Sequence, residues 1–151
     1  MTFVALAAAS VDRSERRIPN ALVAWGAAAL LVAVPLAGVV DGRVRAAAVG
    51  ALAGAVCYAG PLLALHVSSP GGVGFGDVKL GAVLGAGLGA GHPVLAALGL
   101  LAACVVAIVR RLALRRMRGP EPFAPAMAAG VVLASALARP LIAALGFHWM
   151  M

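Results

Sequence analysis

Charged residues are scarce in this chain: they make up 11% of its 151 residues, whereas 64% are hydrophobic. Soluble domains contain about 25% charged residues, so an ordinary water-soluble fold is excluded. A helix that crosses a membrane needs roughly 20 mainly apolar residues, and the length allows about six such helices joined by short loops, with no room for a separate soluble domain. We therefore expect residues 1–151 to form one all-α, multi-pass membrane domain.

Aromatic residues and cysteines are also few, at 5% of the chain and two residues respectively. The net charge of +7 does not indicate nucleic acid, because the basic residues flank apolar runs and no aromatic stacking surface accompanies them. Cys57 and Cys104 lie inside apolar runs without a second Cys or His at metal-ligand spacing, so neither a zinc site nor a cofactor is expected. His66, His92 and His148 lie at the ends of apolar segments, where interfacial roles are expected.

Apolar runs lie between charged or Pro- and Gly-rich breaks, and each run is a candidate helix. The six runs are residues 1–11, 21–40, 46–66, 78–91, 93–109 and 123–146. The first and the fourth are short. At 1.5 Å per residue the first run covers only about 16 Å, roughly half of the hydrocarbon thickness, unless residues before Met1 are missing. A signal peptide is not expected, because the basic residues follow this run instead of preceding it.

The basic residues predict how the runs are threaded. With the loop after the first run in the cytoplasm, most basic residues lie inside, as the positive-inside rule favours, and both termini lie outside. The nine inside are Arg13, Arg16, Arg17, Lys79, Arg110, Arg111, Arg115, Arg116 and Arg118, and the three outside are Arg43, Arg45 and Arg139. This threading leaves only Asp41 outside and gathers the other acidic residues at the cytoplasmic face: Asp12, Glu15, Asp77 and Glu121. A membrane-embedded acid–base site needs several acidic residues on one face of the membrane. The same distribution could also arise by chance.

The first acidic motif is residues 12–20, which read Asp-Arg-Ser-Glu-Arg-Arg-Ile-Pro-Asn. Asp12 closes one apolar run, and Ile-Pro-Asn opens the next. Pro19 suits the first turn of a helix, where its missing N–H is no loss, and Asn20 can satisfy free amides in that turn. Asp12 is either half of an acid–base pair or an interfacial charge beside an Arg cluster that sets topology, and the residues alone support both equally.

The second acidic motif is residues 71–80, a glycine-dense loop that runs into Asp77 at the start of a helix. Asp77 could be only an N-cap favoured by the helix dipole. Against this, Gly81, Gly85 and Gly89 follow near the face of Asp77 and let another helix approach closely. Such a face could bring Asp77 near a second carboxylate, although glycine faces also occur in purely structural bundles.

Asp12 is the most suitable partner for Asp77, because Glu15 lies in the charged loop and Glu121 stands between two prolines. Two aspartates within a few ångströms cannot both ionise easily, so one stays protonated while the other is a carboxylate. The carboxylate can take a proton from a water that attacks an amide, and the acid can donate to the carbonyl. No comparable Ser-His-Asp or Cys-His arrangement is recognisable.

At these residues the sequence resembles the type IV prepilin peptidases, which have an aspartate before Ile-Pro-Asn and a second one in Gly-x-Gly-Asp-x-Lys. Residues 74–79 here read Gly-Phe-Gly-Asp-Val-Lys. Residues 122–125 read Pro-Phe-Ala-Pro, similar to the Pro-Phe-Gly-Pro of the family, with Ala124 replacing the glycine. The residues that match the family's motifs besides the aspartates are Pro19, Asn20, Gly74, Gly76 and Lys79.

The resemblance covers nearly the whole chain and implies an aspartic endopeptidase of the bacterial cytoplasmic membrane, with Asp12 and Asp77 as catalytic residues at the cytoplasmic face and no metal. It implies prepilin or pseudopilin precursors as substrates and membrane lipid as the surroundings. Larger members methylate the new N-terminus and carry a cysteine-containing insertion that this sequence lacks, so methylation is not expected. Members usually have a complete helix before the first aspartate, and the position of Asp12 depends on the eleven residues found there.

Other interpretations stay open. A small proton- or cation-coupled transporter or a secretion-assembly subunit could use the same acids, although no internal repeat of two halves supports a transporter. A relative that cleaves archaeal preflagellins fits the motifs too. Lys79 either stabilises a carboxylate or extends to the interface, and the loop of residues 110–118 is expected to set topology and bind anionic lipid.

Overall fold

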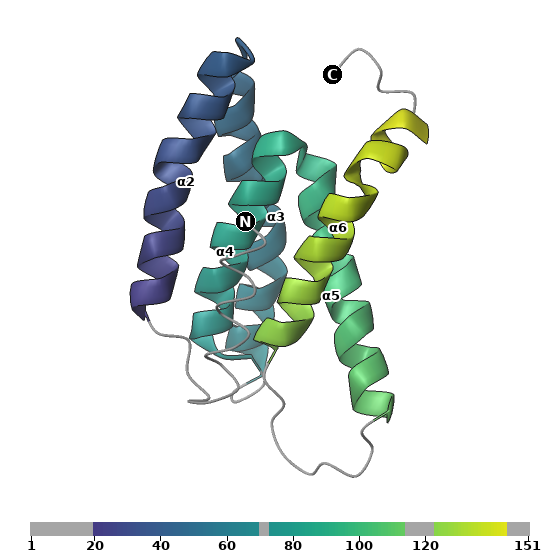
Figure 1. The fold of residues 1–151 in the computed structure, drawn as a ribbon. Helices are drawn as coiled ribbons and strands as arrows, with labels where there is room; N and C mark the ends of the chain where they lie inside the picture. The colour runs from purple at the N-terminus through teal and green to yellow at the C-terminus, as the bar shows by residue number, and fades with distance from the viewer. Residues whose placement is uncertain (1–19, 70–72, 114–122, 145–151) are drawn as a thin grey trace.

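The computed structural model describes residues 20–69, 73–113 and 123–144, and within these ranges the only regular secondary structure is helical. The helices are α2 (Asn20–Val40), α3 (Val44–Ser68), α4 (Phe75–Gly91), α5 (Pro93–Ala113) and α6 (Ala124–Ala144), packed as a bundle (Figure 1). The prediction of an all-α helical bundle is confirmed, and the ends of the five helices agree with the apolar runs to within about four residues. The first predicted run, residues 1–11, lies outside the described residues.

Three of these helices are long and apolar enough to cross a membrane: Val23–Val40, Val44–Ser68 and Pro93–Ala113. Their large apolar side chains point outward, as at Trp25, which is 78% exposed, and Leu52, which is 69% exposed. Lipid chains can surround such side chains at no hydrophobic cost, whereas water cannot. The chain is therefore a multi-pass membrane protein.

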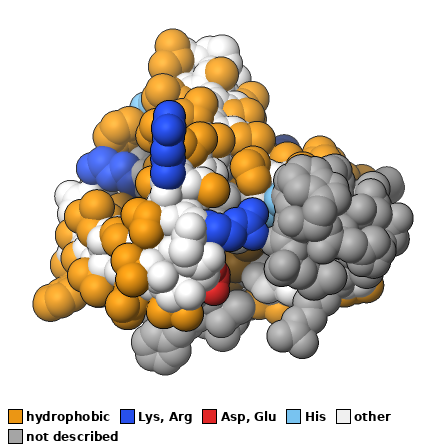
Figure 2. All heavy atoms as spheres, turned by 90° about the horizontal axis from the view of Figure 1, so that it is seen from above, with side chains coloured by type: hydrophobic (Ala, Val, Ile, Leu, Met, Phe, Trp, Pro, Cys, Tyr) orange, Lys and Arg blue, Asp and Glu red, His pale blue; other side chains and the backbone are white. Residues whose placement is uncertain are grey.

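The described helices run alternately up and down, so that loops gather at two ends of the bundle (Figure 1). One end carries the beginnings of α2, α4 and α6 and the last turn of α5 with Arg110 and Arg111. The opposite end carries the turn from α2 to α3, where Asp41, Arg43 and Arg45 are exposed. Seen from above, the molecule shows a few basic side chains among many hydrophobic ones (Figure 2). This alternation agrees with the predicted threading for the loops that the structure describes.

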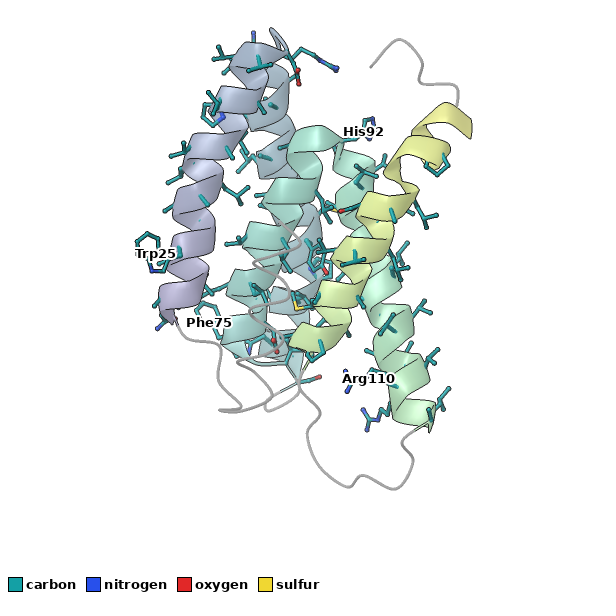
Figure 3. The ribbon with its side chains drawn as sticks, in the orientation of Figure 1. Trp25, Phe75, His92 and Arg110 are labelled. Atoms are coloured by element: carbon teal, nitrogen blue, oxygen red, sulfur yellow. The ribbon has the colours of Figure 1, made fainter. Side chains whose placement is uncertain are left out.

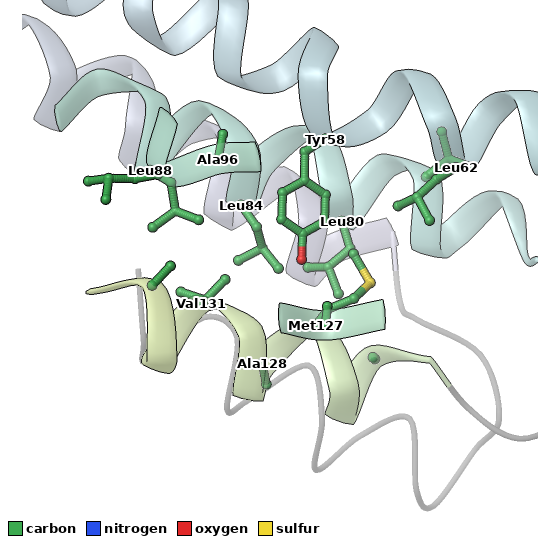
Figure 4. Packing of buried hydrophobic residues seen from close by; sticks show 14 residues of the cluster. Tyr58, Leu62, Leu80, Leu84, Leu88, Ala96, Met127, Ala128 and Val131 are labelled. Atoms are coloured by element: carbon green, nitrogen blue, oxygen red, sulfur yellow. The ribbon is translucent and has the colours of Figure 1, made fainter. Parts of the chain in front are cut away.

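α4 is the central helix, because it contacts α2, α3, α5 and α6. Its residues are apolar on nearly all sides, as expected of a helix that neighbours surround. Leu80 and Leu84 of α4 are fully buried and pack with Tyr58 of α3 and with Met127 and Val131 of α6 (Figure 4). This core holds α4 in place from both sides and so fixes the position of the residues in its first turn.

Glycines let α3 and α4 approach until their backbones touch. A Cβ atom on Gly54 would overlap the carbonyl oxygen of Gly85, and a Cβ atom on Gly50 would overlap that of Gly89. The predicted close approach at the glycine face of α4 is thus present. The helix that packs there is α3, which carries no acidic residue, so this face sets the separation of α3 and α4 and does not itself bring a second carboxylate.

Candidate active site

The Gly-x-Gly-Asp-x-Lys motif forms the start of α4. Gly74 is the N-cap, with extended backbone angles (φ −70°, ψ 143°), and the amide of Asp77 donates to the carbonyl of Gly74 at 3.0 Å. The helix begins at Phe75, so Phe75, Gly76 and Asp77 are its first three residues. Asp77 therefore lies inside the first turn, and the interpretation of Asp77 as the N-cap is wrong.

The carboxyl group of Asp77 folds back toward the beginning of its own helix. Its Oδ2 atom lies 3.5 Å from the position that a Cβ atom would take on Gly74, and the side chain is half-buried. The free amides and the positive end of the helix dipole at this terminus favour a negative charge. α4 thus presents Asp77 at the end of the bundle in surroundings that suit a carboxylate.

Lys79 joins this turn to the first motif. Its Nζ atom donates a hydrogen bond of 3.2 Å to Oδ1 of Asn20, the first residue of α2, from which it is separated by 59 positions in the chain. The same ammonium lies 5.0 Å from the centre of the Phe75 ring, within the range of a cation–π contact. Within the described part of the chain, the contacts of Lys79 are with an amide and a ring, and none is with a carboxylate.

His66, in the last turn of α3, holds the loop that precedes the motif. Its Nδ1 atom lies 2.7 Å from the carbonyl oxygen of Val73, seven residues further on, and its ring centre lies 5.6 Å from that of Phe75, with the planes inclined at 40°. Sequence reasoning assigned His66 only an interfacial role. The only feature of the sequence that could have indicated this contact is the position of His66 shortly before the glycine-rich loop.

The structure thus brings the predicted site residues that it describes together at the end of the bundle where α4 begins, the end at which Figure 3 labels Phe75. These residues are Asn20, Gly74, Gly76, Asp77 and Lys79. The remaining predicted site residues, Asp12 and Pro19, lie outside the described residues, as do Glu15 and Glu121. Sequence reasoning missed Phe75 and His66 as members of this cluster.

The third motif lies at the same end, at the beginning of α6 (Figure 1). The carbonyl of Phe123 accepts the amides of Ala126 and Met127 at 3.0 and 3.1 Å, which fixes the first turn of the helix. Ala124 is fully buried, and Phe123 packs against the core. Pro125 occupies the first turn, where a missing N–H leaves no hydrogen bond unmade. Residues 114–122 lie outside the described ranges.

Metal ligands do not gather in the part of the chain that the structure describes: no group of three His, Cys, Asp or Glu side chains there could hold an ion. Cys57 is exposed on α3 and Cys104 is half-buried on α5. The described residues around the start of α4 include a carboxylate (Asp77), a lysine (Lys79) and an imidazole (His66).

The sequence model of the type IV leader peptidase family matches residues 1–112, which include both aspartate motifs. No curated protein and no solved structure matches the chain.

Proposed function

The chain belongs to the type IV leader peptidase family, and from this premise we propose that it is an aspartic endopeptidase with Asp12 and Asp77 as its catalytic pair. It cleaves the leader peptides of prepilin or pseudopilin precursors at the cytoplasmic face of the bacterial inner membrane. The precursor is its protein partner, and no cofactor takes part. The family match supports a peptidase; the catalytic pair, the substrate and the side of the membrane are our proposal.

The hydrogen bond between Lys79 and Asn20 is the observation that carries this proposal. It joins the last residue of the first motif to the second motif, although 59 positions separate them. The contact therefore supports a common site for Asp12 and Asp77 at the end of the bundle where α4 begins.

In the proposed reaction one aspartate is a carboxylate and the other is protonated, because two close carboxylates do not both ionise easily. The helix N-terminus favours negative charge on Asp77, so we assign the carboxylate to Asp77 and the proton to Asp12. Asp77 takes a proton from water as the oxygen attacks the scissile carbonyl, while Asp12 donates its proton to the carbonyl oxygen. When the C–N bond breaks, the amine leaves with the proton held by Asp77 and the hydroxyl proton returns to Asp12.

A cleavage assay with a tagged prepilin in proteoliposomes tests this proposal. We expect Asp12→Asn and Asp77→Asn each to lower kcat by roughly a thousandfold or more, because each removes one of the two proton-transfer groups. Asp41→Asn is the matched control, since Asp41 is exposed at the opposite end of the bundle, and it should cleave like the wild type. Full cleavage by either of the first two variants would rule out the pair. Proton-driven uptake that both variants abolish, with no cleavage by the wild type, would favour a transporter.

A further inference from the structure

His66 makes a contact that fixes the position of its own proton. A carbonyl oxygen only accepts hydrogen bonds, so the 2.7 Å contact with Val73 requires Nδ1 of His66 to carry the hydrogen. The bond that one ring nitrogen makes sets the tautomer of a neutral histidine. His92 at the other end of the bundle shows the opposite arrangement, because its Nδ1 accepts the amide of Val94 at 3.3 Å.

The segment that leads into α4 is rich in glycine. Residues 71–76 contain four glycines, which have the greatest backbone freedom and no side chains with which to pack. Val73 lies one position before the N-cap of α4 and is half-buried against the core. A hydrogen bond to its carbonyl therefore restrains the chain immediately before the turn that carries Asp77.

His66 also supports the residue after the N-cap. Its ring lies against that of Phe75 at 5.6 Å, a distance typical of aromatic pairs, and Lys79 covers the same ring before it reaches Asn20. A continuous series of contacts thus runs from α3 across the first turn of α4 to α2. Val73 and Phe75, which His66 contacts, flank the N-cap on either side.

We propose that His66 is a positioning residue of the peptidase, which acts through its Nδ1–H bond to Val73 to orient the first turn of α4 and hence Asp77. The functional part rests on the proposed activity, whereas the hydrogen bond is a property of the fold. Loss of this bond leaves the catalytic groups in the protein but lets the turn depart from the productive geometry, which lowers kcat more than it changes KM.

Three substitutions distinguish the effect of the hydrogen bond to Val73 from the effect of the ring contact with Phe75. His66→Asn keeps an N–H group at the position of Nδ1 without the ring, whereas His66→Gln moves the donor outward to the position of Nε2. His66→Phe keeps an aromatic ring for Phe75 but has no donor. We expect kcat for leader cleavage to fall roughly tenfold in the Phe and Gln variants, as for the loss of one ordinary hydrogen bond, and to stay within about twofold of wild type in the Asn variant. His92→Phe, at the opposite end, should leave kcat unchanged.

The tautomer provides a measurement that does not depend on activity. In the full chain labelled with ¹⁵N-histidine in bilayers at alkaline pH, we expect a neutral histidine with the hydrogen on Nδ1. That signal should vanish in His66→Asn, while His92 shows its hydrogen on Nε2. A hydrogen on Nε2 of His66 overturns the proposal, and so does equal cleavage by the Phe and Asn variants when thermal unfolding shows both folded. If the wild type cleaves no leader at all, the proposed activity is wrong. The tautomer measurement then still shows whether the hydrogen bond between His66 and Val73 exists.

Discussion

The two ends of α4 are held by different means. Near its C-terminus, Gly85 and Gly89 meet the backbone of α3 directly, with no side chain between them. Near its N-terminus, long side chains make the connections, as Lys79 does to Asn20 and His66 does to Val73. Backbone contact leaves no room for adjustment, whereas side-chain contacts can be lost singly while the helices stay together. Stability and activity should therefore respond to different substitutions along one helix.

The largest effect on stability is expected at the glycine contact. In Gly54→Ala the new Cβ atom would overlap the carbonyl oxygen of Gly85 and lie 2.7 Å from Cα of Gly89, so α3 and α4 must separate. We expect a loss of about 3 kcal/mol in the free energy of unfolding, the upper part of the range for overpacked contacts. Titration with SDS in mixed micelles measures this quantity.

Gly60→Ala is the matched control on the same helix, since nothing lies within 4 Å of a Cβ atom there. Alanine is a better helix former than glycine, so this variant should gain about 0.5–1 kcal/mol. If both variants changed the stability equally, the steric account of the contact would be wrong.

At the other end of α4 we expect activity to change while stability does not. Lys79→Met removes the hydrogen bond to Asn20 and should lower kcat/KM for leader cleavage roughly tenfold, with less than about 0.5 kcal/mol lost from unfolding because the contact is exposed. Asn20→Ala should have a similar effect. The double variant should be no worse than either single one, because both remove the same bond. Strictly additive losses would show that the two side chains act independently.

The smallest change is expected at Tyr58 of α3, which packs against the middle of α4. Its ring is fully buried, and its hydroxyl group has no hydrogen-bond partner in the residues that the structure describes. Tyr58→Phe removes the unpaired hydroxyl and should raise the unfolding free energy by up to about 1 kcal/mol without altering leader cleavage. A loss of more than this amount in the same SDS titration would indicate that the hydroxyl has a partner in the membrane-embedded protein.

The fold could be predicted from the sequence more fully than the site. Long apolar runs identified every described helix, because a helix that crosses lipid satisfies its own backbone groups and needs about 20 apolar residues to do so. The start of α4 was placed three residues late, since Phe75, Gly76 and Asp77 form a first turn that has no apolar pattern. The glycine face of α4 was recognised, but the partner helix was not, although Gly50 and Gly54 repeat the same spacing on α3.

The contacts within the site could not be predicted in the same way. Lys79 and Asn20 are 59 positions apart, and no local pattern indicates that they meet. His66 bonds to a backbone carbonyl. Because every residue has such a carbonyl, the sequence does not indicate which residue is the partner. The pairing of Asp12 with Asp77 stays a prediction, drawn from the motifs and the resemblance.

The glycine contact between α3 and α4 also has a consequence for heating. Glycine has no rotamers to lose, so this contact forms without a loss of side-chain entropy, whereas immobilising a lysine such as Lys79 costs up to about 2 kcal/mol. Because an entropic cost grows with temperature, warming weakens the contacts around Asp77 before it weakens the glycine contact. The hydrogen bond between Lys79 and Asn20 should therefore be lost at a lower temperature than the glycine contact.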